Sequence, residues 1–427
     1  MPFPRRTLRQ LGADLTTGPF GTVLSAAEYV DGGVPLVNPT HIVAGRILPD
    51  ERVSVSPETA TRLRRHALRP GDLVLGRKGD VGRSALVTDR ESGWLCGSDS
   101  IAVRSDPTLL NGRYLNWVMS SAMARRQLQA RASGATVDGI NERVLLGLVV
   151  PAPDLRCQSV IADYLDRETA RIDALRARYA RLADGLLESR TSLVVAGVAG
   201  IPLVGRRRRS SLPWLQDIPA HWREVKLTLL ARLGSGHTPS REHPEWWRDC
   251  TIPWITTGEV WQIRDDRVEY LSETRERVSH LGVANSSAEI HPAGTVVLSR
   301  TASAGFSAIM AVDMATSQDY VTWTCGPLIR PRYLLLCLRA MRPDLLGRLA
   351  MGSTHQTIYV PDIQTIRVPL PLVEEQDRIA EWTWGRLGRI DWAVDAIGRQ
   401  LTLLAERREA LITAAVTGEL EIPGAAA

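Results

Sequence analysis

The chain of 427 residues is 44% hydrophobic and 23% charged, a balance that is typical of a globular protein and argues against a disordered chain. At about 150 residues per domain, this length predicts two or three domains. The 52 basic and 47 acidic residues leave a net charge of +5, which permits a nucleic-acid partner without demanding one.

Membrane, secreted and metal-scaffold classes are disfavoured. The most apolar run, LLGLVVPAP at 145–153, contains two prolines. It is much shorter than a membrane-spanning helix, which needs about 18 residues. The N-terminal stretch MPFPRRTLRQLGADL lacks the apolar core of a secretion signal. The cysteines form no C-x-x-C pair, which argues against a disulfide scaffold and a thiolate zinc site: they are Cys96, Cys157, Cys250, Cys325 and Cys337. We expect a cytoplasmic protein without a membrane partner.

In chain order, residues 1–155 are expected to form a first mixed α/β domain. The stretch VLGRKGDVGRSALVT at 74–88 predicts a strand, a glycine-rich turn and a second strand. The stretch NGRYLNWVMSSAMARRQLQ at 111–129 predicts a helix.

Residues 156–205 are predicted to form one long helix, from about 157 to 198. Its apolar residues alternate in steps of three and four, with Ser189 as the interruption. The members of this first seam are Ile172, Leu175, Tyr179, Leu182, Leu186 and Leu193. Such a seam is what a helix needs to pack against another helix by knobs into holes.

The second half of the chain follows the same plan. A polar, basic linker, GRRRRSSLPW (205–214), leads from the first helix into the second domain. Residues 206–371 are expected to form this second α/β domain, with a strand–turn–strand at 294–312 and a helix at 331–349. Residues 372–427 hold a second long helix and a tail. Its seam, broken by Arg408, consists of Ile390, Val394, Ile397, Leu401, Leu404 and Leu411.

These two halves are copies of one another. Residues 134–200 align with 352–418 without a gap at an offset of 218, and 20 of the 67 pairs are identical. Upstream the match is weaker and places Arg77 on Arg300. A duplicated pair of domains is therefore predicted, with an internal pseudo-twofold relation. Because a lone 40-residue helix would leave its seam in water, we expect the two helices to pack together. The alternative is that each helix packs onto its own domain.

The sequence offers no recognisable catalytic centre. It lacks the phosphate loop G-x-x-x-x-G-K-[ST], the nucleophile motif G-x-S-x-G, the zinc motif H-E-x-x-H and the Asn/Asp-Pro-Pro-aromatic tetrapeptide of amino-methyltransferases. His237 and His243 have no cysteine nearby and are expected at the surface rather than on a metal. The two large domains each carry a net charge of +4, whereas the helical segments are neutral to acidic. Two basic modules with a spacer suit a bipartite nucleic-acid site.

Several stretches carry a family resemblance. QSVIADYLDRETARIDAL (158–175), VPLPLVEEQDRIAEW (368–382) and LITAAVTGEL (411–420) resemble the spacer regions of Type I restriction–modification specificity subunits. WLQDIPAHWREVKL (214–227) resembles the opening of a target-recognition domain of that family, and GDLVLGRKGDVG (71–82) resembles a later part. The resemblance covers essentially the whole chain.

The resemblance implies a non-catalytic subunit with two target-recognition domains, each reading one half of an asymmetric split sequence in double-stranded DNA. It implies that the two helices form an antiparallel coiled coil and dock two modification (adenine methyltransferase) subunits, which two restriction/motor subunits then join. S-adenosylmethionine, ATP and magnesium belong to those partners, so this chain itself is expected to bind no cofactor and no metal.

Two local departures stand out. Cys157 replaces the acidic residue that Glu375 supplies in the second copy. The pair Gly71-Asp72 becomes Gly294-Thr295, so the second turn is expected to differ.

The expected DNA-binding side chains flank the glycine-rich turns of the two domains. They are Arg77, Lys78, Arg83, Arg300 and Thr301. A turn arginine that is merely solvated or caps a carbonyl is the alternative for each. Three other functions stay open: a specificity subunit that serves a fused nuclease–methyltransferase, a coiled-coil scaffold without DNA binding, and a degenerate enzyme with an unrecognised site.

Overall fold

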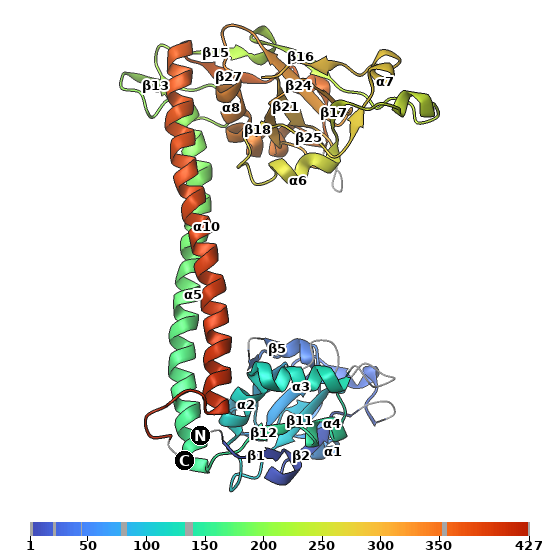
Figure 1. Cartoon of the computed structure of the whole chain (residues 1–427), viewed down its shortest axis with the longest axis vertical. Helices are drawn as coiled ribbons and strands as arrows, with labels where there is room; N and C mark the ends of the chain where they lie inside the picture. The colour runs from blue at the N-terminus through green and yellow to red at the C-terminus, as the bar shows by residue number, and fades with distance from the viewer. Residues whose placement is uncertain are drawn as a thin grey trace. The chain divides into compact units, whose positions relative to one another are not determined.

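The chain folds into two compact units in a computed structural model that describes residues 3–19, 23–43, 45–77, 83–132, 140–351 and 357–425. Unit 1 consists of Met1–Tyr179 together with Arg399–Ala427, and unit 2 of Ala180–Gly398. Both long helices, α5 (Leu155–Val198) and α10 (Val373–Thr417), contribute a half to each unit (Figure 1). Lys78 lies outside the described residues.

Unit 1 is built around an antiparallel sheet of order β2-β11-β8-β9. Its strands are Asp14–Thr17, Ser100–Arg104, Leu73–Gly76 and Ser84–Leu86. A second sheet has the order β10-β4-β7-β3, with strands Leu95–Cys96, Val34–Val37, Ser54–Val55 and Tyr29–Val30. Smaller pairs are β1 (Arg5–Thr7) with β12 (Val149–Pro151) and β5 (Ile42–Val43) with β6 (Arg46–Ile47).

The helices of unit 1 besides the long pair are α1 (Pro57–Arg62), α2 (Gly112–Ser120), α3 (Ala122–Ala132) and α4 (Glu142–Leu146). The prediction of one helix over 111–129 is therefore wrong in one respect, because the structure has two helices there, separated at Ser121. The Ser121 hydroxyl donates to the Val118 carbonyl at 2.6 Å, and its extended backbone ends α2.

Unit 2 repeats this arrangement with an added strand, in the order β16-β24-β21-β22-β18. These strands are Ala231–Ser235, Tyr320–Cys325, Val296–Ser299, Ser307–Met310 and Tyr270–Leu271. The second sheet, of order β19-β17-β23-β20, contains Arg277–Val278, Ile252–Ile255, Met314–Thr316 and Ile290–His291. Helices α6 (Val260–Ile263), α7 (His280–Ala284), α8 (Pro331–Asp344) and α9 (Val360–Ile363) complete it, with the pairs β15 (Arg223–Lys226) with β27 (Arg367–Leu370) and β25 (Ala350–Met351) with β26 (Thr357–Ile358).

The basic linker predicted at 205–214 contains a β-strand. β13 (Arg207–Arg209) pairs with β14 (Asp217–Pro219) in an antiparallel hairpin. The Arg207 guanidinium donates to the carbonyls of Ala199 at 2.7 Å and Asp217 at 2.7 Å. A cation beside the carbonyl end of a helix is stabilising, so Arg207 helps to end α5.

Identical contacts in the two units confirm the duplication. The buried Gln158 carboxamide accepts from the Asn111 backbone N–H and donates to the Pro153 carbonyl, both at 2.8 Å. Gln376 makes the equivalent contacts, accepting from the Arg330 N–H at 2.8 Å and donating to the Pro371 carbonyl at 3.1 Å. These glutamines tie the first turn of each long helix to the loop before α2 or α8, because a buried amide must be paired.

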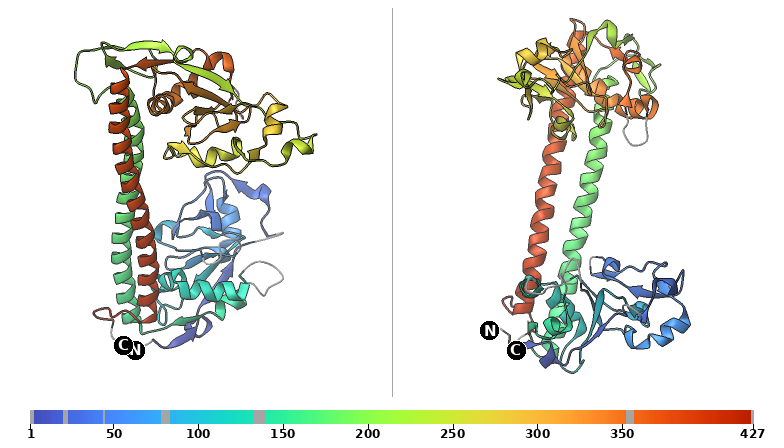
Figure 2. Two further views of the ribbon diagram at one scale, coloured as in Figure 1. Left: turned by 45° about the horizontal axis from the view of Figure 1, so that its top comes forward. Right: turned by 90° about the vertical axis from the view of Figure 1, so that its right-hand side faces the viewer.

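The two long helices run side by side in opposite directions (Figure 2). In unit 1, Ile161 and Leu165 of α5 share one hydrophobic core with Ile412 and Val416 of α10. In unit 2 the other ends meet, where Val194 and Val198 share a core with residues near the start of α10. The predicted antiparallel packing therefore holds in each unit. No described helix is long and apolar enough to span a bilayer.

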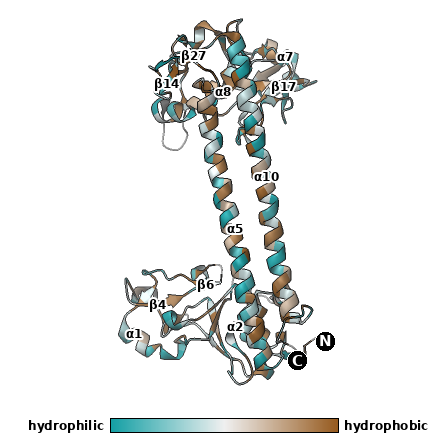
Figure 3. Ribbon diagram, turned by 90° about the vertical axis from the view of Figure 1, so that its left-hand side faces the viewer, coloured by the Kyte–Doolittle hydropathy of each residue, from teal (hydrophilic) through white to brown (hydrophobic). Residues whose placement is uncertain are grey.

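The middle of the predicted seam is less buried than expected. Ile172 and Ile397 are both 6% exposed, but Leu175 is 44% and Leu182 is 53% exposed, so the chain by itself does not bury these two leucines. The other seam residues are half-buried: Tyr179, Leu186, Leu193, Ile390, Val394, Leu401, Leu404 and Leu411. Among the described residues, neither main core includes an α5 residue between Leu165 and Leu193, so the apolar side chains of this stretch do not pack into a domain core. Hydrophobic and hydrophilic residues alternate along both helices (Figure 3).

Candidate nucleic-acid interface

Arg300 lies directly after β21, at one end of the five-stranded sheet of unit 2, and is held by its backbone and by its side chain. Its N–H donates to the Asp319 carbonyl and its own carbonyl accepts from the Ile358 N–H, both at 2.8 Å. Its Nε donates to the Gln318 carbonyl at 2.9 Å. No other described residue binds the terminal nitrogens of its guanidinium, which therefore keep donors to offer to a ligand.

Arg77 occupies the same place in unit 1, after β8. Its N–H donates to the Asp99 carbonyl and its carbonyl accepts from the Ile140 N–H, both at 2.8 Å. Its Nε donates to the Ile140 carbonyl at 3.4 Å. The Arg77 side chain thus binds the segment that also binds its backbone carbonyl, whereas the Arg300 side chain binds the segment that binds its N–H. Both arginines are half-buried. The weak sequence match of Arg77 with Arg300 is thus a match of structural positions.

The remaining predicted contacts differ between the units. Arg83 is exposed at the start of β9 and its Nη1 donates to the Pro39 carbonyl at 3.5 Å. Its counterpart in unit 2 is Phe306, whose ring lies 4.6 Å from the Arg342 guanidinium. Thr301 is half-buried in the turn, and its carbonyl accepts from the Ser303 N–H at 2.7 Å. The two turns therefore present different side chains on one scaffold.

Ala302, next in this turn, has a backbone φ of 63°. This left-handed conformation costs a non-glycine residue about 1 kcal/mol or more. Strain of this kind often marks a functional segment.

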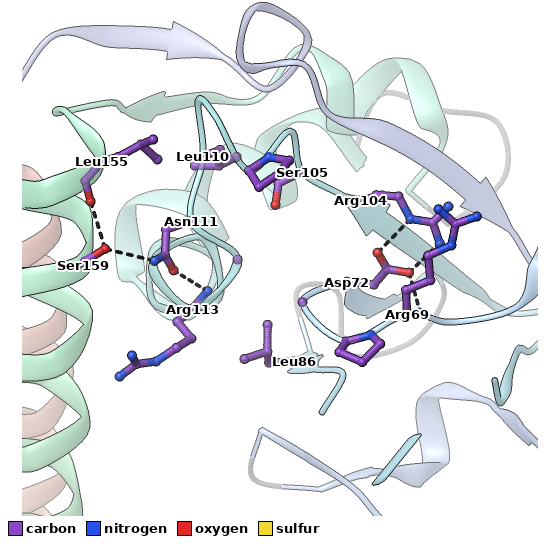
Figure 4. A pocket seen from close by; sticks show the side chains of 14 residues that line it. Arg69, Asp72, Leu86, Arg104, Ser105, Leu110, Asn111, Arg113, Leu155 and Ser159 are labelled. Atoms are coloured by element: carbon purple, nitrogen blue, oxygen red, sulfur yellow. Dashed lines mark hydrogen bonds and ion pairs between the residues drawn. The ribbon is translucent and has the colours of Figure 1, made fainter. Parts of the chain in front are cut away.

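The expectation that the Gly71-Asp72 and Gly294-Thr295 turns differ is wrong. Gly71 and Gly294 adopt φ values of 92° and 86°, which favour glycine. What differs is the partner of the next residue. Asp72 pairs with Arg104 at 2.7 Å, as Figure 4 shows, whereas Thr295 hydrogen bonds to Thr324 at 3.2 Å. A half-buried ion pair in unit 1 corresponds to a neutral pair in unit 2, and the turn is preserved.

A cavity of about 550 Å³ opens beside this ion pair, between the domain and the first turns of α5 (Figure 4). Several of its polar groups already have partners. Asn111 caps α2 and donates to the Ser159 hydroxyl at 3.2 Å, and Arg113 pairs with Asp163 at 2.9 Å. The described residues contain no cluster of three or more possible metal ligands. The cavity is thus part of the joint between domain and helix.

Burial governs the shifted pKa values of the cysteines. It raises the pKa of Cys96 and of Cys325 to about 12, so these thiols are protonated at neutral pH and are poor nucleophiles. Burial also lowers the pKa of His291, which is therefore neutral at that pH.

Two reciprocal ion pairs join the long helices. Arg190 of α5 pairs with Asp391 of α10 at 2.9 Å in unit 2, and Arg408 of α10 pairs with Asp173 of α5 at 3.2 Å in unit 1. The arginines and the aspartates are each related by the repeat offset. The sequence contained this signal, because both residue types recur at fixed spacing, but sequence reasoning did not pair them. Polar contacts of this kind fix the register of paired helices.

The departure at Cys157 has a structural consequence. Glu375 accepts from the Trp222 indole N–H at 3.1 Å and lies 2.9 Å from His221 Nε2, which binds the start of α10 to the opening of the second domain. Cys157 instead donates its thiol to the carbonyl of Ala425 at 3.1 Å. The first copy thus uses this position to hold the C-terminal tail.

Proteins of known type resemble this chain in sequence. Residues 219–382 match the family described as Type I restriction modification DNA specificity domain. Over 165 residues the chain is 27% identical to the Type I restriction enzyme MjaIX specificity subunit of Methanocaldococcus jannaschii, covering 38% of this chain and 37% of that protein. Over 373 residues it is 22% identical to the EcoBI specificity subunit of Escherichia coli, covering 82% and 74%. The alignments with the MjaIX, StySPI and EcoKI subunits span only about two fifths of those relatives.

Solved structures share the whole fold. The HsdS subunit from Thermoanaerobacter tengcongensis superposes with a TM-score of 0.59 at 18% identity over 98% of this chain and 97% of that one. A chain from a study of complex assembly and conformational transition in a type I R-M system superposes with a TM-score of 0.75 at 17% identity over 98% of both chains. The fold is duplicated, and its second copy is the one that matches the specificity-domain model. Residues 219–382 thus match the specificity domain of Type I restriction–modification systems, and the whole chain shares the fold of the HsdS subunit.

Proposed function

We propose that this chain is the non-catalytic DNA-recognition subunit of a Type I restriction–modification enzyme, with each unit reading one part of a bipartite, asymmetric site in double-stranded DNA. One observation carries the proposal. Arg77 and Arg300 occupy equivalent strand ends in two copies of one sheet, each fixed through its backbone N–H, its carbonyl and its Nε.

Fixed arginines suit this task. A guanidinium whose Nε is already bound still presents terminal N–H groups, and arginine recognises guanine O6 and N7 or a phosphate through such donors. The surrounding turns differ between units, because Arg83 in one corresponds to Phe306 in the other. One scaffold with two different turns is suited to two different half-site sequences.

The proposed partners follow from the family. Two modification subunits would dock on the helical region and two restriction/motor subunits would join them in the cytoplasm. In this proposal S-adenosylmethionine, ATP and magnesium are used by those subunits and not by this chain. The role left to this chain is to bind DNA at a defined sequence and to hold the partners there.

The test is methylome mapping after co-expression with the modification subunit. The wild-type chain is expected to direct adenine methylation to one two-part sequence, and the modification subunit alone is expected to give none. Arg77→Ala should weaken binding by about 1–3 kcal/mol with a relaxed base in one half-site if it reads a base, or lower the salt slope by about one if it touches phosphate. Arg300→Ala should do the same for the other half-site.

Matched controls are Arg9→Ala and Arg223→Ala. Both residues are exposed arginines outside the two turns and should leave the recognised sequence unchanged. Methylation of no defined sequence by the wild-type complex would overturn the proposed function. An unchanged sequence, affinity and salt slope in both turn variants would overturn the proposed site alone.

A further inference from the structure

Gln318 is an exposed glutamine that the repeat does not share, and it lies beside Arg300. It precedes Asp319, whose carbonyl binds the Arg300 N–H, and its own carbonyl accepts from Arg300 Nε at 2.9 Å. The equivalent residue of unit 1, just before Asp99, is Ser98. The two units therefore differ in side-chain chemistry at the position next to their equivalent arginines.

The Gln318 carboxamide is held in place. The Thr238 hydroxyl donates to Gln318 Oε1 at 2.8 Å. Thr238 belongs to the segment after β16, and that segment is fixed here because the His237 N–H donates to the Thr316 carbonyl at 3.0 Å. The bond orients the amide and reduces the rotamer freedom that a ligand would otherwise have to restrict.

This arrangement leaves the carboxamide able to bind in two ways at once. The Oε1 atom has a second lone pair, and no described residue accepts from the Nε2 amide hydrogens. An amide that accepts through its oxygen and donates through its nitrogen matches the N6 and N7 atoms of adenine in the major groove. The neighbouring guanidinium offers donors only, which match guanine.

We propose that Gln318 is a base-reading residue for an adenine in the half-site of unit 2, with Thr238 as its positioning residue. The inference rests on the proposed function and names a contact within it. Unit 1 has serine at this position, whose single hydroxyl cannot make the bidentate contact. The adenine preference is therefore confined to one half-site.

The experiment is selection from a random double-stranded DNA library by the complex of the full chain with its modification subunit. Gln318→Ala is expected to lose the preference for adenine at one position, a change of about 5- to 100-fold in relative binding, and to leave the other half-site unchanged. Gln318→Glu should shift that position toward cytosine, because a carboxylate accepts from the cytosine amino group.

Variants of Thr238 and of a control glutamine distinguish a loss of base reading from a loss of folding. Thr238→Val should relax the same position partly, and Thr238→Ser, which keeps the hydroxyl, should restore it. Gln216→Ala removes an exposed glutamine of the β13–β14 hairpin and should change nothing. Equal thermal unfolding of all variants would show that the fold is intact.

The possible outcomes separate a failure of the proposed function from a failure of the role assigned to Gln318. If the wild-type complex selects no two-part sequence, the proposed function fails. If it does and Gln318→Ala selects the identical sequence with the identical preference, the base-reading role is overturned while the function stands. A loss of binding to all sequences in Gln318→Ala, without a change in preference, would also overturn it.

Discussion

The two units share one fold but attach to their helices differently. In unit 2 the loop before β18 places Asp266 against Arg342 at 2.6 Å, and the Asp266 carbonyl accepts from Arg190 of α5 and from Arg339 of α8, both at 2.6 Å. Burial lowers the pKa of Arg339 to about 10, so it remains charged at neutral pH. In unit 1 the corresponding links are half-exposed pairs between α2 or α3 and the helices, such as Arg113–Asp163 at 2.9 Å.

This contrast separates two ways to join a domain to a helix. A buried network is rigid and costly to disturb, because removing one charge leaves the others without a partner in a low dielectric. Exposed pairs contribute little, typically up to about 1 kcal/mol, and are screened by salt. The duplication therefore preserved the fold of each domain while the strength of its attachment diverged.

The largest effect is expected from Asp266→Asn, which removes the charge in unit 2 and keeps a residue that tolerates the positive φ of 59°. We expect a loss of about 3 kcal/mol in the free energy of unfolding of unit 2, because buried arginines lose their counter-charge. Urea unfolding followed by tryptophan fluorescence measures it. The control is Asp265→Asn, an exposed neighbour whose carboxylate lies 3.8 Å from Arg267. Equal stability of the two variants would refute the contrast between the units.

A smaller effect is expected where the units exchanged an ion pair for a neutral pair. Asp72→Thr alone should destabilise unit 1 by about 1–3 kcal/mol, because Arg104 then keeps a half-buried charge without its partner. The double variant Asp72→Thr with Arg104→Thr reproduces the pair of unit 2 and should recover a large part of that loss. A double-mutant cycle in urea measures the coupling. Additive effects of the two substitutions would mean that the pairs are not equivalent.

The smallest effect concerns the strained turn of unit 2. Ala302→Gly should raise the free energy of unfolding by about 0.5 kcal/mol, since glycine adopts a positive φ without a Cβ clash. Gly305→Ala is the opposite control, because its φ is 91° and an added Cβ would lie 2.8 Å from Arg342 Cγ. A thermal melt of both variants checks the signs. Destabilisation by Ala302→Gly would show that this turn is not under strain.

Local patterns predicted most of the fold. The strand–turn–strand segments, the two long helices and their duplication depend on periodicity and turn residues, which the sequence contains directly. The exposure of Leu175 and Leu182 was not predictable in this way, since a heptad-like seam does not state how far the partner helix and the domains cover it.

The site was predicted only in part. Arg77 and Arg300 could be found because they recur beside glycine-rich turns, although their contact with DNA is still a prediction. Gln318 and Asp266 carried no local signal, because their roles depend on segments that are distant in sequence. The turn at Gly294-Thr295 was misjudged for the same reason: its compensating change, Thr324, lies on another strand.

The discontinuity of unit 1 has a consequence for biosynthesis. Its core includes Ile412, Ala415 and Val416, which are synthesised after the whole of unit 2, whereas unit 2 is a continuous segment. At about 5–20 residues per second, the N-terminal domain waits tens of seconds for these residues. Unit 2 can therefore complete its core before the domain that was synthesised first. A truncated chain that stops before α10 ends would leave that first domain with an uncovered apolar surface, which is the kind of intermediate that chaperones bind.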